Sequence, residues 1–120
     1  MMQTLGAELA EVEKGRVTIT APILPSVLQQ QGAGHAGLAF SIADSAAGYS
    51  ALTIMPEGTE VMTVEMKINL MSPAVGDRLV AEGRVVRAGR RITVVAADVW
   101  AETDDDRTHV AMMQGTVIAV

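Results

Sequence analysis

The sequence of 120 residues contains no cysteine and only three aromatic residues, one each of Trp, Tyr and Phe. Without cysteine there can be no disulfide, no thiolate metal site and no cysteine nucleophile. Two histidines are too few for most zinc enzymes, although carboxylates could complete a ligand set, so we expect no metal and no cofactor. The shortage of aromatics leaves Val, Ile, Leu, Ala and eight Met to fill the core. It also suggests that some apolar surface is buried between subunits.

Long apolar runs and excess positive charge are missing as well. No apolar run approaches the ~20 residues of a membrane span, and residues 1–15 lack the basic-then-apolar pattern of a secretion signal. We therefore expect an intracellular, cytoplasmic protein that does not enter a membrane. The net charge of −5 argues against a nucleic-acid binder. The length and the 49% hydrophobic content predict one globular domain over residues 1–120.

The positive charges are unevenly distributed. Of nine Lys and Arg residues, five lie in one short segment: Arg78, Arg84, Arg87, Arg90 and Arg91. An acidic protein with one basic segment can hold a small polyanion. Composition alone slightly favours the alternative, a solvated strand face.

The hydrophobic pattern predicts a single helix. The N-terminal segment has β-branched residues after a turn signal at Lys14 and Gly15, which predicts a first hairpin or bent strand. A glycine-punctuated loop over residues 29–34 follows. One helix is then predicted over residues 36–55, ended by Pro56.

Everything after the helix has the pattern of strands. Residues 61–70 alternate, which predicts one apolar face of Met62, Val64, Met66, Ile68 and Leu70 and one polar face of Thr63, Glu65, Lys67 and Asn69. Three more strands are predicted over 78–87, 91–100 and 108–120. Their short links favour an antiparallel meander, because parallel strands would need crossover helices. One apolar helix can be buried by such strands only if the sheet curls around it, which predicts an α+β fold.

Asp44 is the most informative residue of the predicted helix. It is the only acidic residue between Arg16 and Glu57, and its flanks, residues 42–43 and 46–47, are Ile and Ala. An isolated carboxylate in such a setting costs roughly several kcal/mol unless it is paired, hydrogen-bonded or protonated. We therefore favour a functional role over a solvated helix-surface aspartate.

His35 and Gln29 lie nine and fifteen residues before Asp44, in a glycine-rich segment just ahead of the helix. The start of a helix offers unpaired N–H groups and a dipole that favours negative charge. A carboxylate, an imidazole and a helix N-terminus together have the composition of an acyl-transfer site.

The segment QQQGAGHAGLAFSIADSAAGYSAL (29–52) resembles a family signature in which a His-Gly-Gly-like turn precedes a helix with an Asp nine residues after the His. With MSPAVGD (71–77), the whole chain resembles the hotdog-fold acyl-CoA thioesterases of the phenylacetate-degradation (PaaI-like) type. The resemblance implies one long central helix wrapped by a curled antiparallel sheet of five to six strands. It also implies hydrolysis of an acyl-CoA thioester to free acid and CoA. The family usually has Gly after the His, where this chain has Ala36.

The resemblance also implies roles for the residues around the helix start. Asp44 would act as general base on water or attack the thioester directly, and the sequence leaves both open. The backbone N–H of Ala36, beside Gly37, would bind the oxyanion; Ala can supply this N–H if its φ is negative. The His35 side chain would brace the loop or contact the thioester, and a plain helix cap is the equally weighted alternative.

Two further polar residues match family positions. Gln29, with Gln31 as the fallback, would orient the attacking water or the carbonyl, because an amide both donates and accepts. Thr63 matches a Ser or Thr that lies near the nucleophilic water in relatives. The alternation of residues 61–70 places it on the polar face.

The basic segment would then bind the CoA phosphates. The predicted turn of Gly89, Arg90 and Arg91 is the expected contact, with help from Arg87, because the guanidinium fork suits phosphate. His109 is interpreted as an ordinary strand residue.

In relatives the long helices of two protomers lie side by side, and each Asp faces the oxyanion turn of the other subunit. A small-residue face of the helix suits this approach: Gly37, Ser41, Asp44, Gly48 and Ala51. The resemblance therefore implies a homo-oligomer, a dimer that commonly pairs into a tetramer. Two alternatives stay open, a catalytically silent acyl-CoA-binding hotdog module and a hotdog dehydratase or hydratase.

Overall fold

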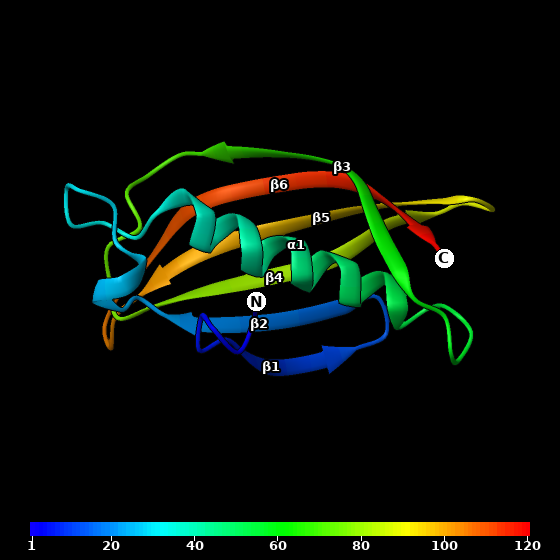
Figure 1. Cartoon of the computed structure of the whole chain (residues 1–120), viewed down its shortest axis with the longest axis horizontal. Coiled ribbons are helices and arrows are strands. Elements are labelled where there is room, and N and C mark those ends of the chain that lie inside the picture. Colours follow the sequence, from blue (N-terminus) through cyan, green and yellow to red (C-terminus); the bar gives the residue numbers. More distant parts are fainter.

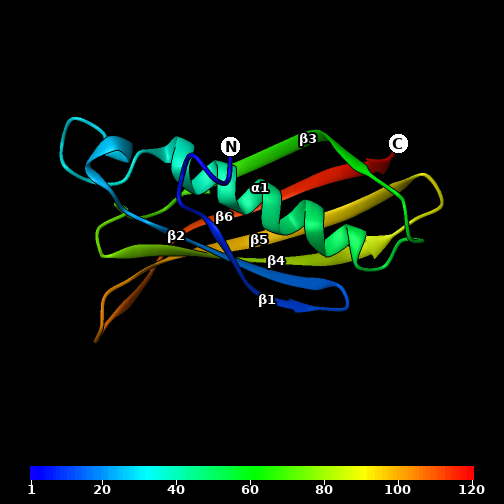
Figure 2. The same cartoon turned by 60° about the horizontal axis from the view of Figure 1, so that its bottom comes forward.

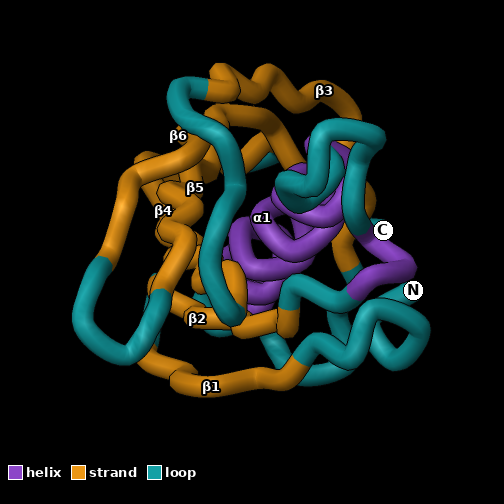
Figure 3. Tube along the Cα trace, turned by 90° about the vertical axis from the view of Figure 1, so that its left-hand side faces the viewer, coloured by secondary structure: helices purple, strands orange, loops and turns teal.

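The computed structural model describes all 120 residues and contains one long helix cradled by one sheet (Figure 1). Its elements are β1 (Glu8–Glu13), β2 (Arg16–Pro22), a 3-10 turn η1 (Pro25–Val27), α1 (Ala36–Leu52), β3 (Val61–Leu70), β4 (Arg78–Ala88), β5 (Ile92–Glu102) and β6 (Arg107–Ala119). Figure 3, which views the helix nearly end-on, shows the strands curling around it. The curled antiparallel sheet with a central helix is the α+β architecture that the sequence predicted. None of the helical segments has the length and hydropathy that a bilayer span requires.

The strand order differs from the predicted meander. The order is β1-β2-β4-β5-β6-β3, and every neighbouring pair is antiparallel. The predicted meander would place β4 beside β3, and this is wrong, because β3 pairs with β6 at the edge of the sheet. The helix fills the concave side of the sheet, so β2 and β3 lie on opposite flanks of it (Figure 1). The link over residues 71–77 then crosses the end of the sheet to reach β4.

Helix α1 begins at Ala36 as predicted but ends at Leu52, three residues before the predicted end. The Thr53 hydroxyl donates to the Ser50 carbonyl at 2.7 Å and accepts the Gly15 N–H at 2.6 Å. These bonds tie the end of the helix to the turn between β1 and β2. The sequence predicted this turn at Lys14 and Gly15.

Alanine forms the contact between helix and sheet. Ala43, Ala46 and Ala47 are completely buried. Of the eight methionines only Met113 is fully buried, and Met2, Met55 and Met66 pack against the core from its edge, so the prediction that Met fills the core is only partly confirmed. The aromatic residues lie outside the core too, since Phe40 and Tyr49 are exposed on the helix and Trp100 lies on the outer face of β5.

Alanine forms this contact because α1 and β4 lie very close together. A Cβ atom placed on Gly83 would lie 2.3 Å from the carbonyl carbon of Ala46 and 2.6 Å from the nitrogen of Ala47. The helix backbone therefore rests directly on the β4 backbone. Such contact leaves room only for glycine and alanine between the two elements.

Strand β3 contains a β-bulge that breaks the predicted alternation. Thr63 pairs with Val117 and Glu65 with Thr116, which leaves Val64 as an extra residue. Beyond the bulge Met66 and Ile68 pack against the core as predicted. Before it the prediction is wrong: the exposed residues are Met62 and Val64, and Leu70 at the far end is also exposed.

The contact between α1 and β4 generates a stability prediction. Gly83→Ala should lower the free energy of unfolding by about 1–3 kcal/mol or more, because the new Cβ forces the helix off the sheet. The matched control is Gly48→Ala in the same helix, where a Cβ would meet only Val61, at 3.8 Å. That control should be neutral or stabilising, since alanine is the better helix former. Urea unfolding followed by circular dichroism measures both, and equal losses would contradict the prediction.

Candidate active site

A cavity of about 350 Å³ lies between the loop before α1 and the link from β3 to β4. The Gly34 N–H donates to the Ala74 carbonyl at 2.8 Å, and the His35 N–H donates to the Val27 carbonyl at 2.8 Å. The first bond fixes the loop against the link, and the second fixes it against η1. The walls combine polar groups of the loop with apolar side chains of the sheet and helix: Gln29, His35, Ala36, Ala39, Leu70, Pro73, Ala74 and Val110 are among them.

His35 is the N-cap of α1. Its Nδ1 accepts the Gly37 N–H at 2.8 Å, so the proton of the neutral ring is on Nε2. The helix-cap interpretation that the sequence left open therefore describes this contact. In this cap Nδ1 is occupied by the Gly37 N–H, and Nε2–H stays available as a donor.

The Ala36 N–H at the first position of the helix has no hydrogen-bond partner in the chain. Ala36 is exposed, borders the cavity, and has a negative φ, as do all non-glycine residues of the chain. An unpaired N–H at the positive end of a helix, in a residue that borders a cavity, is suited to stabilise an oxyanion.

The side chain of Gln29 helps to shape the loop that it belongs to. Its Oε1 accepts the backbone N–H of Gln31, so the amide NH₂ is the part left for other contacts. Gln29 can therefore donate to a carbonyl in the cavity. The fallback residue Gln31 also lines the cavity.

Asp44 lies half-buried in the middle of α1 and is bonded to β3. Its Oδ1 accepts the hydroxyl hydrogen of Thr63 at 2.8 Å. The bulge of β3 turns Thr63 toward the helix, which the alternation of the sequence did not predict.

One chain alone does not bring Asp44 to the oxyanion donor. Asp44 follows Ala36 by eight residues, a rise of about 12 Å along the helix. Asp44 is also absent from the lining of the cavity. The structure therefore places Gln29, His35 and Ala36 together and keeps Asp44 and Thr63 apart from them.

The predicted small-residue face of the helix is partly wrong. Gly48 and Ala51 are buried against the chain's own strands. The open face of the helix instead carries Ser41, Ser45 and Tyr49 beside Asp44. Spacing along the helix identified the start of this face but could not locate β3, which covers its far end.

The basic segment divides into two parts. Arg78 pairs with Glu102 at 3.0 Å and Arg84 with Asp98 at 2.7 Å, so their charges are neutralised. The other three arginines are exposed and unpaired at the hairpin between β4 and β5: Arg87, Arg90 and Arg91. Gly89 makes the turn, because a Cβ there would lie 2.8 Å from the Ile92 carbonyl oxygen.

This hairpin and the loop before α1 lie at opposite ends of the molecule, whose longest dimension is 43 Å (Figures 1 and 2). Within a single chain the arginines are therefore remote from the cavity.

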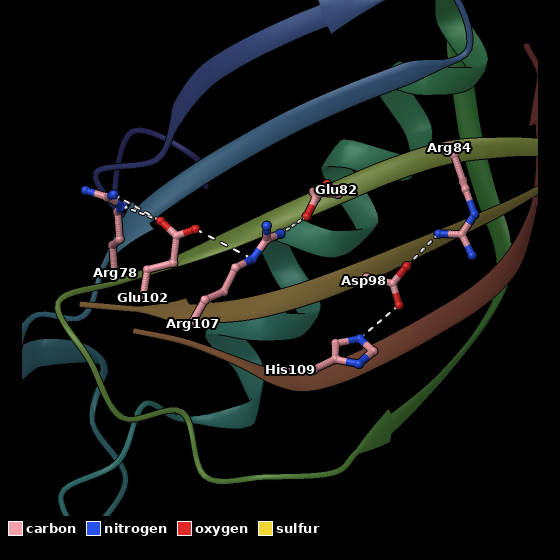
Figure 4. Close-up of polar contacts among 7 residues, drawn as sticks. All are labelled: Arg78, Glu82, Arg84, Asp98, Glu102, Arg107 and His109. Atoms are coloured by element: carbon pink, nitrogen blue, oxygen red, sulfur yellow. Dashed lines mark hydrogen bonds and ion pairs between the residues drawn. The ribbon is translucent and has the colours of Figure 1, made fainter. Parts of the chain in front are cut away.

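A polar network that the sequence did not indicate lies on the outer face of the sheet (Figure 4). His109 bonds to Asp98 at 2.9 Å and stacks on Trp100 with ring centroids 4.3 Å apart. Arg107 lies over the same indole at 4.1 Å and pairs with Glu82 and Glu102. The network lies on the face of the sheet opposite the helix, and His109 is not among the residues that line the cavity.

A long helix wrapped by a curled antiparallel sheet, with a cavity beside its capped start, is the architecture of a hotdog domain. The model of the Thioesterase superfamily matches residues 31–108. The chain belongs to this superfamily, which confirms the family resemblance found in the sequence.

Solved structures agree. A thioesterase family protein from Silicibacter pomeroyi has 39% identity and a TM-score of 0.96, over 99% of this chain and 88% of the other. The PaaI protein from the phenylacetic acid degradation operon of Escherichia coli has 22% identity and a TM-score of 0.87, over 99% and 83%. The BH2602 protein of Bacillus halodurans, crystallised with CoA, has 28% identity and a TM-score of 0.78, over 86% and 66%. These likenesses confirm the hotdog fold.

A curated relative, provisionally named an esterase, comes from Saccharolobus solfataricus. It is 31% identical over 91 residues, which are 76% of this chain and 64% of the relative. The chain thus matches a little under two thirds of that relative's length.

Proposed function

We propose that this protein is an acyl-CoA thioesterase, which hydrolyses a thioester to a free acid and CoA. The observation that carries the proposal is the unpartnered N–H of Ala36, a residue at the N-terminus of α1 that lines the cavity. Membership of the thioesterase superfamily supports the reaction class. The half-buried Asp44 supports the mechanism, because a silent binding module would have no need of it.

Asp44 drives the attack on the thioester. As general base it takes a proton from water while the water oxygen bonds to the thioester carbon. As nucleophile it forms a mixed anhydride that water then cleaves. Along both routes the C–S bond breaks, the sulfur leaves as thiolate, and protonation gives the free thiol of CoA.

The helix start stabilises the transition state. The carbonyl oxygen becomes negative during attack and receives the Ala36 N–H, which the helix dipole reinforces. The NH₂ group of Gln29 is available as a second donor, since its oxygen is bonded to Gln31. His35 holds this helix start in place through its bond to Gly37.

The catalytic groups come from two chains of a homodimer. The separation of about 12 Å between Ala36 and Asp44 on one helix is too large for one thioester carbon. Two antiparallel helices related by a twofold axis near Phe40, which is midway between them, would bring each Asp44 to the partner's helix start. Phe40 is exposed on the helix, and β3 is an edge strand available for pairing. Further pairing would give a tetramer.

The unpaired arginines of the β4–β5 hairpin bind the CoA phosphates. Arg87, Arg90 and Arg91 are free of carboxylate partners, so their guanidinium forks are available to phosphate. Their distance from the cavity of the same chain requires that the hairpin serve a site of another subunit. The BH2602 protein, crystallised with CoA, supports the choice of ligand. A CoA ester as substrate also agrees with the predicted cytoplasmic location.

The first functional prediction concerns Asp44. Asp44→Asn should lower kcat by about 10²–10⁴-fold while leaving acyl-CoA affinity intact, because the carboxylate acts in the transition state. An acyl-CoA panel with a thiol-reactive dye finds the best substrate, and calorimetry with a non-hydrolysable analogue reports affinity. Asp105→Asn in the exposed β5–β6 turn is the control for charge. A variant within threefold of the parent kcat would refute the mechanism. Parent protein that binds the analogue without turnover of any thioester would indicate the silent module.

The second prediction removes the oxyanion donor. Ala36→Pro deletes one N–H at the first helical position, where proline fits and where the preceding His35 is already extended (φ −64°, ψ 143°). We expect kcat to fall by about 10²–10³-fold, the usual cost of one such donor. Ala36→Ser, which keeps the N–H, is the control.

Mixing the two variants tests the shared site. Asp44→Asn and Ala36→Pro chains, refolded together, should form heterodimers with one intact and one doubly altered site. Activity should return to about a quarter of the parent value, because half of the dimers then have one working site of two. If mixing restores nothing, while each variant alone refolds to a dimer, the shared site is wrong.

The third functional prediction concerns the hairpin. Arg90→Ala should raise KM for acyl-CoA and leave kcat nearly unchanged, since a remote phosphate contact is equally strong in ground and transition states. The KM and kcat for a short thioester without the nucleotide should not change. Lys67→Ala, on the outer face of β3, is the control for lost positive charge. Equal losses with both substrates would show that Arg90 does not bind CoA.

A further inference from the structure

The bond between Thr63 and Asp44 joins the edge strand β3 to the middle of α1. The hydroxyl of Thr63 donates to Oδ1 of Asp44 at 2.8 Å, and both groups are half-buried. This is the only hydrogen bond made by the Asp44 side chain, so Oδ2 has no partner within the chain. One carboxylate oxygen is therefore held and the other is open.

The β-bulge makes this contact compatible with the rest of the strand. In a regular strand Thr63 and Glu65 would point to the same side of the sheet. With Val64 inserted between them, Thr63 pairs with the buried Val117 while Glu65 lies opposite Thr116 on the outer face. The inserted residue thus allows one strand to present a hydroxyl to the helix and a carboxylate to solvent.

A threonine hydroxyl carries one hydrogen, and here Asp44 accepts it. Toward a water molecule Thr63 is then left with acceptor capacity only. The donor function of Thr63 acts on the carboxylate, which it holds against rotation about the Cβ–Cγ bond.

We propose that Thr63 is a positioning residue, presented by the β-bulge at Val64, which holds Oδ1 of Asp44 so that Oδ2 faces the reacting thioester. This inference rests on the proposed function and adds how the carboxylate is oriented. It differs from the role near the water that the family resemblance implies, because Thr63 works through Asp44.

The test compares two substitutions. Thr63→Val keeps the shape and removes the donor, and we expect kcat to fall by about 10–100-fold with KM unchanged, the effect of a misoriented reacting group. Thr63→Ser restores the hydroxyl and should stay within about threefold of the parent. Thr116→Val, on the opposite face of the paired strand β6, controls for a Thr-to-Val change in this part of the sheet. Thr63→Ala replaces the Val variant if thermal unfolding shows that the latter is not folded.

A double-mutant cycle separates action through Asp44 from direct action on water. If Thr63 acts through the carboxylate, Thr63→Val should cause no further loss in the Asp44→Asn protein. A multiplicative loss in that background, or a Thr63→Val variant with the parent kcat, would overturn the proposal. Its failure is distinguishable from failure of the proposed function, because the latter shows in the Asp44→Asn variant alone.

Discussion

The direct contact between the backbones of α1 and β4 governs the rest of this structure. Gly83 has no side chain, and the helix residues that pack against it are the fully buried Ala46 and Ala47. A helix so close to its sheet buries apolar surface mainly through small residues. The three aromatic side chains lie elsewhere, with Phe40 and Tyr49 on the open side of the helix and Trp100 on the outer face of the sheet. The start of the helix is held separately, by the His35 cap and by the bond from Gly34 to Ala74.

Along α1, the candidate catalytic carboxylate lies far from the candidate oxyanion donor. The helix start holds His35 and Ala36 beside a cavity, while Asp44 lies about two turns further along, bonded to β3. A straight helix cannot bring these groups together. In the proposed homodimer, the open helix face and the free edge of β3 would pair with a second copy of the chain and complete the site.

The predictions from sequence were accurate where a local rule determines the structure. The helix start, the turn at Lys14 and Gly15 and the hairpin around Gly89 lie where capping and turn chemistry predicted them. The predictions failed where an inserted residue, or a partner distant in sequence, determines the structure. The bulge at Val64 reversed the faces of half a strand, and ion pairs with β5 neutralised two of the five clustered arginines.

The sequence by itself determined the α+β class, the family, and the residues around the helix start as candidates. Helix capping, glycine spacing and apolar periodicity are local properties that survive without knowledge of the fold. Only the tertiary structure decided that β3 lies beside β6, that Thr63 reaches Asp44, and that Asp44 lies outside the cavity at the helix start. These facts depend on strand register and on contacts between residues distant in sequence. Side-chain alternation along one strand cannot reveal which partner the strand will choose or where a bulge will shift it.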